Sequence, residues 1–130
     1  MPLSNYLEQR LFNHAFRNVT YTPPGTIYLA LYTSSPTKAD TGTEVSGGAY
    51  ARRAIPFAAA AIEGGKMTIK NNIELPFNVA TADWGLITHF GLRDALTGGN
   101  LMAFEALSPR TIQMNDRYIG EENKFIVRFA

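Results

Sequence analysis

Residues 86–107 have the sequence LITHFGLRDALTGGNLMAFEAL. Its first part alternates, with positions 86, 88, 90 and 92 on one face and positions 87, 89 and 93 on the other, which is the period of a β-strand. The tetrapeptide Thr97–Asn100, TGGN, is a hairpin turn signal, and a second apolar run follows over 101–107. The stretch therefore predicts two antiparallel strands joined by a tight turn.

Further alternating segments lie on both sides of this hairpin. They predict strands at 27–32, 50–57, 66–70, 73–77, 111–114 and 124–129. Strand 27–32 is apolar on both faces and is expected at the centre of a sheet, whereas Pro56 favours an edge position for 50–57. Roughly seven or eight short strands with no helices between them favour antiparallel packing over βαβ units. We predict an all-β fold, an antiparallel, jelly-roll-like β-sandwich with an N-terminal α-helix.

The predicted helix spans residues 3–16. Ser4 can cap it, and Leu3, Leu7, Leu11 and Ala15 recur every four residues, so the helix is amphipathic. The segment Pro23–Gly25, PPG, prevents its continuation. We expect one domain over 1–130, composed of this helix and a β-sandwich over 26–130.

Composition excludes several classes of function. The chain has 130 residues, 45% hydrophobic and 18% charged, and its 12 basic and 11 acidic residues leave a net charge of +1. This balance provides no basic stripe for nucleic acid. Cysteine is absent, so disulfides and thiol chemistry are excluded. We expect no membrane contact, because no apolar run approaches the roughly 18 residues that span a bilayer, and the first residues do not form a secretion signal.

Catalytic and metal-binding patterns are weak. His14 is expected on the polar side of the helix, and His89 lies within a strand with Asp83 and Asp94 nearby in sequence, but no G-x-S-x-G nucleophile motif accompanies them. The sequence also contains no H-x-x-x-H motif, calcium loop or phosphate-binding loop. A pair of acids contributed by different strands, as in glycosidases, stays open at this point. We predict a protein that is not an enzyme and needs no cofactor or metal.

Several blocks of the sequence carry a resemblance. They are 3–8, 14–17, 21–24, 27–34, 42–52, 80–85, 88–91 and 94–101. In these blocks the chain resembles a family of small structural proteins of tailed bacteriophages that are commonly labelled phage tail fibre protein. The likeness covers most of residues 3–107 and fades beyond Leu107.

The resemblance implies a virion protein made in the cytoplasm of the host bacterium, with three functions to consider. A compact sandwich without repeats is similar to capsid cement or decoration proteins, which bind the assembled shell of the major capsid protein and stabilise it. This is the main prediction, with a place on the capsid exterior. The alternative is a tail or tail-fibre component bound to tail proteins. A carbohydrate-binding adhesin is the third.

The expected contacts follow from this interpretation. The protein would form a homo-oligomer, a dimer or trimer, through helix 3–16 or an edge strand, and loops 35–48 and 78–85 would meet the virion partner. The candidate interface residues are Leu7, Leu11, Tyr21, Tyr50, Arg52, Trp84 and Tyr118. Aromatic side chains in this set would be anchors, although Tyr50 and Trp84 could equally complete the core.

Overall fold

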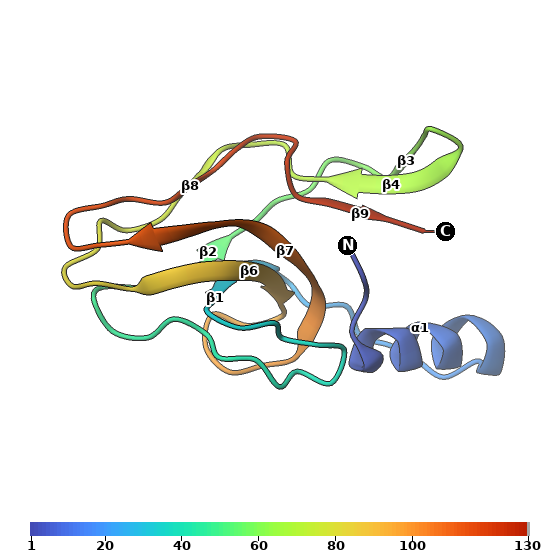
Figure 1. The fold of residues 1–130 in the computed structure, drawn as a ribbon. Helices are drawn as coiled ribbons and strands as arrows, with labels where there is room; N and C mark the ends of the chain where they lie inside the picture. Colours follow the sequence, from blue (N-terminus) through green and yellow to red (C-terminus); the bar gives the residue numbers. More distant parts are fainter. Residues whose placement is uncertain (130) are drawn as a thin grey trace.

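A computed structural model describes residues 1–129, which contain one helix followed by nine strands (Figure 1). The elements are α1 (Asn5–Arg17), β1 (Tyr28–Tyr32), β2 (Arg53–Ala54), β3 (Ala61–Glu63), β4 (Lys66–Lys70), β5 (Leu75–Pro76), β6 (Gly85–Arg93), β7 (Leu101–Ile112), β8 (Ile119–Gly120) and β9 (Ile126–Arg128). The predicted β-region extends to residue 130, which lies outside the described residues. Helix α1 confirms the predicted helix with a shift of its start, because Ser4 accepts the N–H of Leu7 and thereby caps it.

A single long hairpin builds most of the molecule. Its arms pair antiparallel in three stretches, β6 with β7, β5 with β8 and β4 with β9, and its tip is the turn at 94–100. Backbone hydrogen bonds continue the pairing between these stretches, from Phe77 N to Tyr118 O (2.9 Å) and from Trp84 N to Ile112 O (2.8 Å). The hairpin folds back on itself between its β6–β7 and β5–β8 stretches. As a result, the β5–β8 stretch lies over the β6–β7 stretch (Figure 1).

The inner part of the hairpin belongs to a four-stranded sheet in the order β2-β1-β6-β7. Strand β1 pairs with β6 over all five of its residues, and four of those five are buried. Its central place confirms the prediction from its two apolar faces. The predicted strand 50–57 is reduced to β2, two residues at the edge of the sheet, as Pro56 requires.

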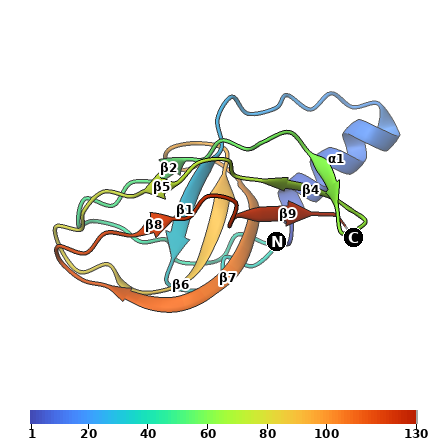
Figure 2. The ribbon, with the colours of Figure 1, turned by 90° about the horizontal axis from the view of Figure 1, so that it is seen from above.

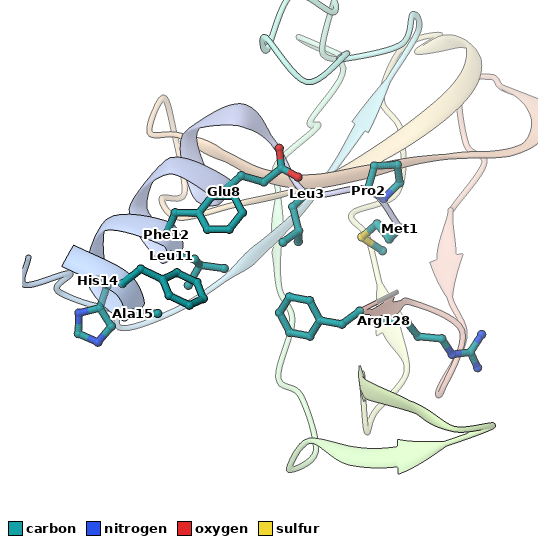
Figure 3. A pocket seen from close by; sticks show the side chains of 11 residues that line it. Met1, Pro2, Leu3, Glu8, Leu11, Phe12, His14, Ala15 and Arg128 are labelled. Carbon is teal, nitrogen blue, oxygen red and sulfur yellow. The ribbon is translucent and has the colours of Figure 1, made fainter. Parts of the chain in front are cut away.

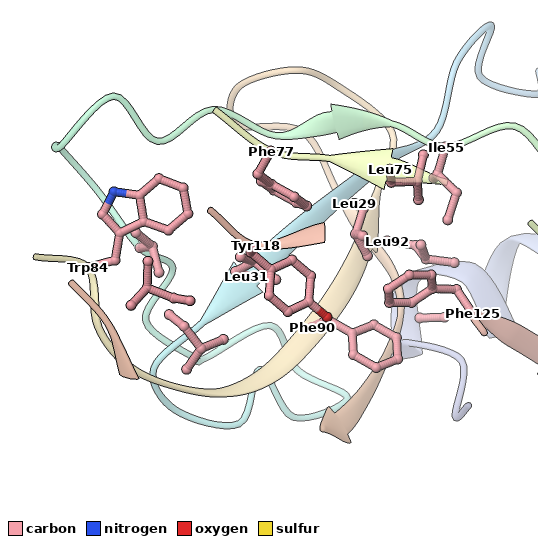
Figure 4. Packing of buried hydrophobic residues seen from close by; sticks show 14 of the residues in the cluster. Leu29, Leu31, Ile55, Leu75, Phe77, Trp84, Phe90, Leu92, Tyr118 and Phe125 are labelled. Carbon is pink, nitrogen blue, oxygen red and sulfur yellow. The ribbon is translucent and has the colours of Figure 1, made fainter. Parts of the chain in front are cut away.

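The hydrophobic core lies between this sheet and the β5–β8 ribbon. Figure 4 shows side chains of both layers meeting there. One aromatic pair crosses the core edge to face, Phe90 with Phe125 (ring centroids 4.8 Å apart), and a second edge-to-face pair, Phe77 with Tyr118 (5.5 Å), joins the two arms of the ribbon. Two packed layers of antiparallel strands are a sandwich, so the predicted fold class is confirmed.

Strand β7 corrects one prediction. The sequence predicted separate strands at 101–107 and 111–114, but β7 runs unbroken from Leu101 to Ile112. Because β7 is an edge strand, Pro109 can sit where no partner needs a backbone N–H.

Strand β6 corrects another. Its register against β7 shifts between Ile87, which pairs with Arg110, and His89, which pairs with Ala106, so that β7 bulges opposite Thr88. The bulge reverses the face pattern, so that Ile87 is fully buried while Leu86 is 50% exposed. The sequence had placed Leu86 on the same face as Phe90.

Two further elements were not predicted. Strand β3 forms a hairpin with β4 through Gly64–Gly65, and β9 completes this sheet in the order β3-β4-β9. The alanine-rich approach to β3 lacks the β-branched residues that favour strands, which is why its sequence carried no signal. Strand β8 is only two residues long and was missed for its shortness.

The N-terminal residues hold α1 against the large sheet. Ser4 N donates to Met102 O (2.8 Å), and Phe104 N donates to Pro2 O (3.1 Å), so residues 2–4 cover the first part of the β7 edge. From there α1 projects away from the sandwich, beside the β3–β4–β9 sheet (Figure 2).

Candidate interaction surface

Helix α1 is amphipathic, yet none of its residues is fully buried. Leu7 and Leu11 are half-buried, and Leu7 packs against the core cluster. One turn further, Phe12 is 64% exposed and Phe16 is 79% exposed, with their rings 5.9 Å apart. The spacing of four residues places these two rings in one ridge along the helix. The apolar face of α1 is therefore only partly covered by its own chain.

The chain returns along the polar side of the helix. Asn18 ends α1 in a left-handed conformation (φ 58°), and Tyr21 N then donates to Nδ1 of His14 (3.3 Å). Tyr21 is half-buried, and burial raises the pKa of its phenol. Its hydroxyl finds no hydrogen-bond partner among residues 1–129. The return segment thus covers the polar side of the helix and leaves Phe12 and Phe16 exposed.

A cleft of about 570 Å³ opens beside the exposed part of the helix. Its lining residues come from three places, namely the α1 residues Glu8, Leu11, Phe12, His14, Ala15 and Phe16, the N-terminal residues Met1, Pro2 and Leu3, and the end of the chain at Arg128 and Phe129. Figure 3 shows Leu11 and Phe12 on the helix side, with Leu3 and Met1 on the N-terminal segment next to the helix. We call this hollow the helix–sheet cleft.

The β3–β4–β9 sheet extends the apolar wall of the cleft. Ile62 pairs directly with Met67, and Phe129 N donates to Met67 O (3.1 Å) in the next strand. Cross-strand partners point to the same face, so these three side chains form one row. Their exposed fractions are 70% for Ile62, 44% for Met67 and 58% for Phe129. Helix and sheet thus present apolar side chains around a common hollow.

The structure places three of the aromatic interface candidates in the core. Trp84 is 5% exposed and Tyr118 is 6% exposed. Tyr50 packs edge to face on Trp84 (5.4 Å) and stacks on Phe77 (6.3 Å). Trp84 Nε1 also donates to Gly48 O (2.8 Å). Figure 4 shows Trp84 and Tyr118 among the core side chains. These three residues therefore leave little surface for a partner.

Arg52, the remaining candidate, belongs to a buried polar network. Its Nε and Nη2 donate to the two carboxylate oxygens of Glu44 (2.8 and 2.7 Å), and its Nη1 donates to the carbonyls of Ala95 and Gly98. Glu44 also accepts the hydroxyl of Tyr50 (2.6 Å). Arg52 thereby ties the loop at 35–48 to the hairpin tip.

A second arginine, Arg93, also links the loop at 35–48 to the hairpin tip. The sequence did not identify it as a candidate. Arg93 donates to both oxygens of Asp40 (2.8 and 2.9 Å), to the hydroxyl of Tyr32 (3.0 Å), and to the carbonyls of Gly98 and Gly99. Burial lowers its pKa, but the hydrogen bonds to Asp40 and Tyr32 outweigh burial, so the pKa stands above its ordinary value. No sequence pattern links two residues that are 53 positions apart.

Both arginines donate their N–H groups to acceptors within the same chain. This end of the sandwich is therefore tied together by internal hydrogen bonds, whereas the helix–sheet cleft gathers several exposed apolar side chains in one place.

Within the described residues 1–129, the histidines and the acids near them do not form a catalytic triad. His89 Nδ1 bonds to Thr88 Oγ1 (2.8 Å), while Asp83 and Asp94 accept backbone N–H groups of Met114 and Asn100. Among residues 1–129 no group of three or more His, Asp or Glu side chains is placed to hold a metal ion. Over the same residues no helix has the length and apolar character needed to cross a bilayer.

Comparison with known proteins places the chain in a family. No curated protein matches the sequence. The sequence model of one protein family, described as podophage GP4 fiber I protein gp80, matches residues 2–128. This match covers nearly the whole chain, including α1 and all nine strands. The chain therefore belongs to the podophage GP4 fiber I protein gp80 family and is a structural protein of a tailed phage.

Proposed function

We propose that the protein is a structural component of a phage tail fibre and is bound in the virion to other tail proteins. The observation that carries this proposal is the family match over residues 2–128, whose description names a fibre protein. The tail alternative from the sequence is therefore better supported than the capsid-cement prediction. The family gives no support to the major capsid protein as the partner.

The architecture suits a rigid part of an assembly. The hairpin tip and the loop at 35–48 are locked to one another by Arg52 and Arg93, and the core joins both layers of the sandwich. Such a cross-linked domain suits a structural role, in which it holds its neighbours in fixed positions, better than a catalytic role. The exposed apolar side chains of the helix–sheet cleft are the surface on which an assembly contact would bury the most area.

Gold-labelled antibody against the protein, bound to intact virions and imaged by negative stain, tests the proposal. We expect gold at the tail or its fibres, and antibody pre-absorbed with the purified protein as the control should leave the particles unlabelled. Gold spread over the head would overturn the tail assignment and restore the capsid-cement prediction. An unlabelled virion that also lacks the protein by mass spectrometry would refute both.

A further inference from the structure

The helix–sheet cleft exposes enough apolar area for a stable protein interface. Phe12, Phe16 and Phe129 are 64%, 79% and 58% exposed. At about 200 Å² for each aromatic side chain, they present roughly 400 Å² together. The neighbouring Ile62 and Met67 add to this surface. A standard interface buries about 800 Å² per partner and is about 65% apolar in homodimers, so it needs about 500 Å² of apolar surface.

The same surface presents both a projection and a hollow. Phe12 and Phe16 form the ridge on α1, and the cleft of about 570 Å³ lies directly beside them. In a two-fold dimer the same patch meets itself, so each copy must supply the feature that the other copy receives. A patch with an aromatic ridge and an adjacent apolar hollow satisfies this condition.

The charges around the cleft are compatible with self-association. Its lining contains one carboxylate, Glu8, and two cations, the guanidinium of Arg128 and the terminal ammonium of Met1, which lies 3.8 Å from the carboxylate of Glu105. A surface with charges of a single sign would repel its own copy, and it would instead favour a partner of opposite charge. Because positive and negative charges in the lining nearly balance, two copies do not repel each other, and a partner of opposite charge has no advantage.

From these three observations we infer that the occupant of the helix–sheet cleft is a second copy of this chain. The two copies are related by a two-fold axis, and the Phe12–Phe16 ridge of each copy lies in the cleft of the other. The inference rests on the geometry of the isolated protein and goes beyond the proposed place in a tail fibre. A monomeric protein located on the tail would refute the dimer and leave the tail-fibre proposal standing. A dimer located on the head would refute the tail-fibre proposal and leave the dimer standing.

Sedimentation velocity on the purified full chain tests the dimer. We expect a species of twice the 14.3 kDa protomer mass that dissociates on dilution. The double variant Phe12→Gln/Phe16→Gln should weaken the dimer about 100-fold or more, because large aromatic side chains dominate interface energies. Both side chains are largely exposed, so the variant should keep the circular dichroism spectrum and unfolding midpoint of the parent. Met114→Gln is the matched control, since Met114 is 58% exposed outside the cleft.

A parent protein that stays monomeric at all concentrations, or that forms a trimer, overturns the inference. A dimer that survives the double variant overturns the assigned surface. Mixing adds a sharper test, with Phe16→Gln in one copy and Phe129→Gln in the other. A two-fold ridge-in-cleft contact then leaves one of its two halves intact, so the mixture should form heterodimers more readily than either variant forms homodimers. If the heterodimer is as weak as the two variant homodimers, the proposed two-fold contact of ridge and cleft is wrong.

Discussion

Arg93 and Asp40 meet in a two-pronged ion pair, with Nη1 2.8 Å from Oδ1 and Nη2 2.9 Å from Oδ2. The side chain of Arg93 is 9% exposed and that of Asp40 is 37% exposed, so the cation is buried while the anion reaches the surface. The remaining N–H groups of Arg93 go to Tyr32 and to the hairpin tip. One buried cation therefore connects a loop, a central strand and the tip of the long hairpin.

Replacement of Arg93 should destabilise the fold strongly. Arg93→Met should lower the free energy of unfolding by about 3 kcal/mol, because it leaves the Gly99 carbonyl and the Asp40 carboxylate without their donor and removes one of the two arginine donors to the Gly98 carbonyl. Asp40→Asn should lower it by only about 1 kcal/mol, since the half-exposed carboxamide is solvated. Urea unfolding of both variants and the parent measures the difference. Equal losses would show that Arg93 acts only through Asp40.

Alkaline pH should unfold the protein through its buried tyrosines. Burial, followed by the hydrogen bond to Glu44, raises the pKa of Tyr50 far above its ordinary value of 10.0, and burial also raises the pKa of Tyr32 and Tyr118. The folded state therefore keeps protons that the unfolded chain releases above pH ~10, and stability falls as pH rises. Each such tyrosine should contribute about 1.4 kcal/mol per pH unit until its folded pKa is reached.

Urea unfolding at a series of alkaline pH values, together with the absorbance of tyrosinate, measures this effect. The variant Tyr50→Phe should be less stable at neutral pH, because Glu44 loses a donor, but its stability should decline less steeply above pH ~10. Tyrosinate absorbance that rises fully before unfolding would contradict the assignment.

Gly48 should be the less replaceable member of the Gly47–Gly48 pair. Both have positive φ (77° and 59°), but only at Gly48 would an added Cβ meet a neighbour, 2.8 Å from Trp84 Nε1 and 3.0 Å from Ala82 O. Gly47→Ala should cost about 1 kcal/mol for its left-handed backbone. Gly48→Ala should cost about 1–3 kcal/mol more, because it crowds the indole. The fluorescence of Trp84, the one tryptophan, reports unfolding of both variants.

The Gly47 variant is the control for backbone strain alone. If both substitutions cost the same, crowding against Trp84 has no role. An altered emission maximum in the folded Gly48→Ala protein would independently show that the indole has moved.

Ser4 should matter more than an ordinary helix cap. Its Oγ accepts Leu7 N (3.1 Å) and donates to Leu101 O, and the residue is 1% exposed. Ser4→Ala should therefore lower the free energy of unfolding by about 2 kcal/mol, at the upper end of the usual range for a cap, because the Leu101 carbonyl also loses a partner. Chemical denaturation measures it, with Ser46→Ala at an exposed loop position as the control. A loss no larger than that of the control would remove Ser4 from the docking of α1.

Much of the fold was readable from local pattern. The hairpin around TGGN, the central strand β1, strand β4 and the capped helix all follow from periodicity and turn residues in short windows. The exceptions have physical causes. The bulge of β7 opposite Thr88 reverses the faces of β6, and the edge position of β7 tolerates Pro109, and neither is visible in alternation alone.

The interaction surface was only partly readable. An amphipathic helix with Leu11 near its centre indicated a surface in need of cover, and the structure does leave Phe12 and Phe16 exposed. The aromatic candidates were harder to assign, because a Tyr or Trp suits a core and an interface equally well. Only the packing of Tyr50 and Trp84 on one another placed them inside.

The fold class, the helix and its cap, the hairpin turn and the family follow from the amino-acid sequence, since each depends on residues close together in the chain or on long blocks of likeness. Where the long hairpin folds over, which arginines close the sandwich, and which apolar side chains remain exposed follow only from the three-dimensional packing. Those outcomes depend on pairs such as Arg93 and Asp40, 53 residues apart, whose meeting is set by the shape of the whole chain.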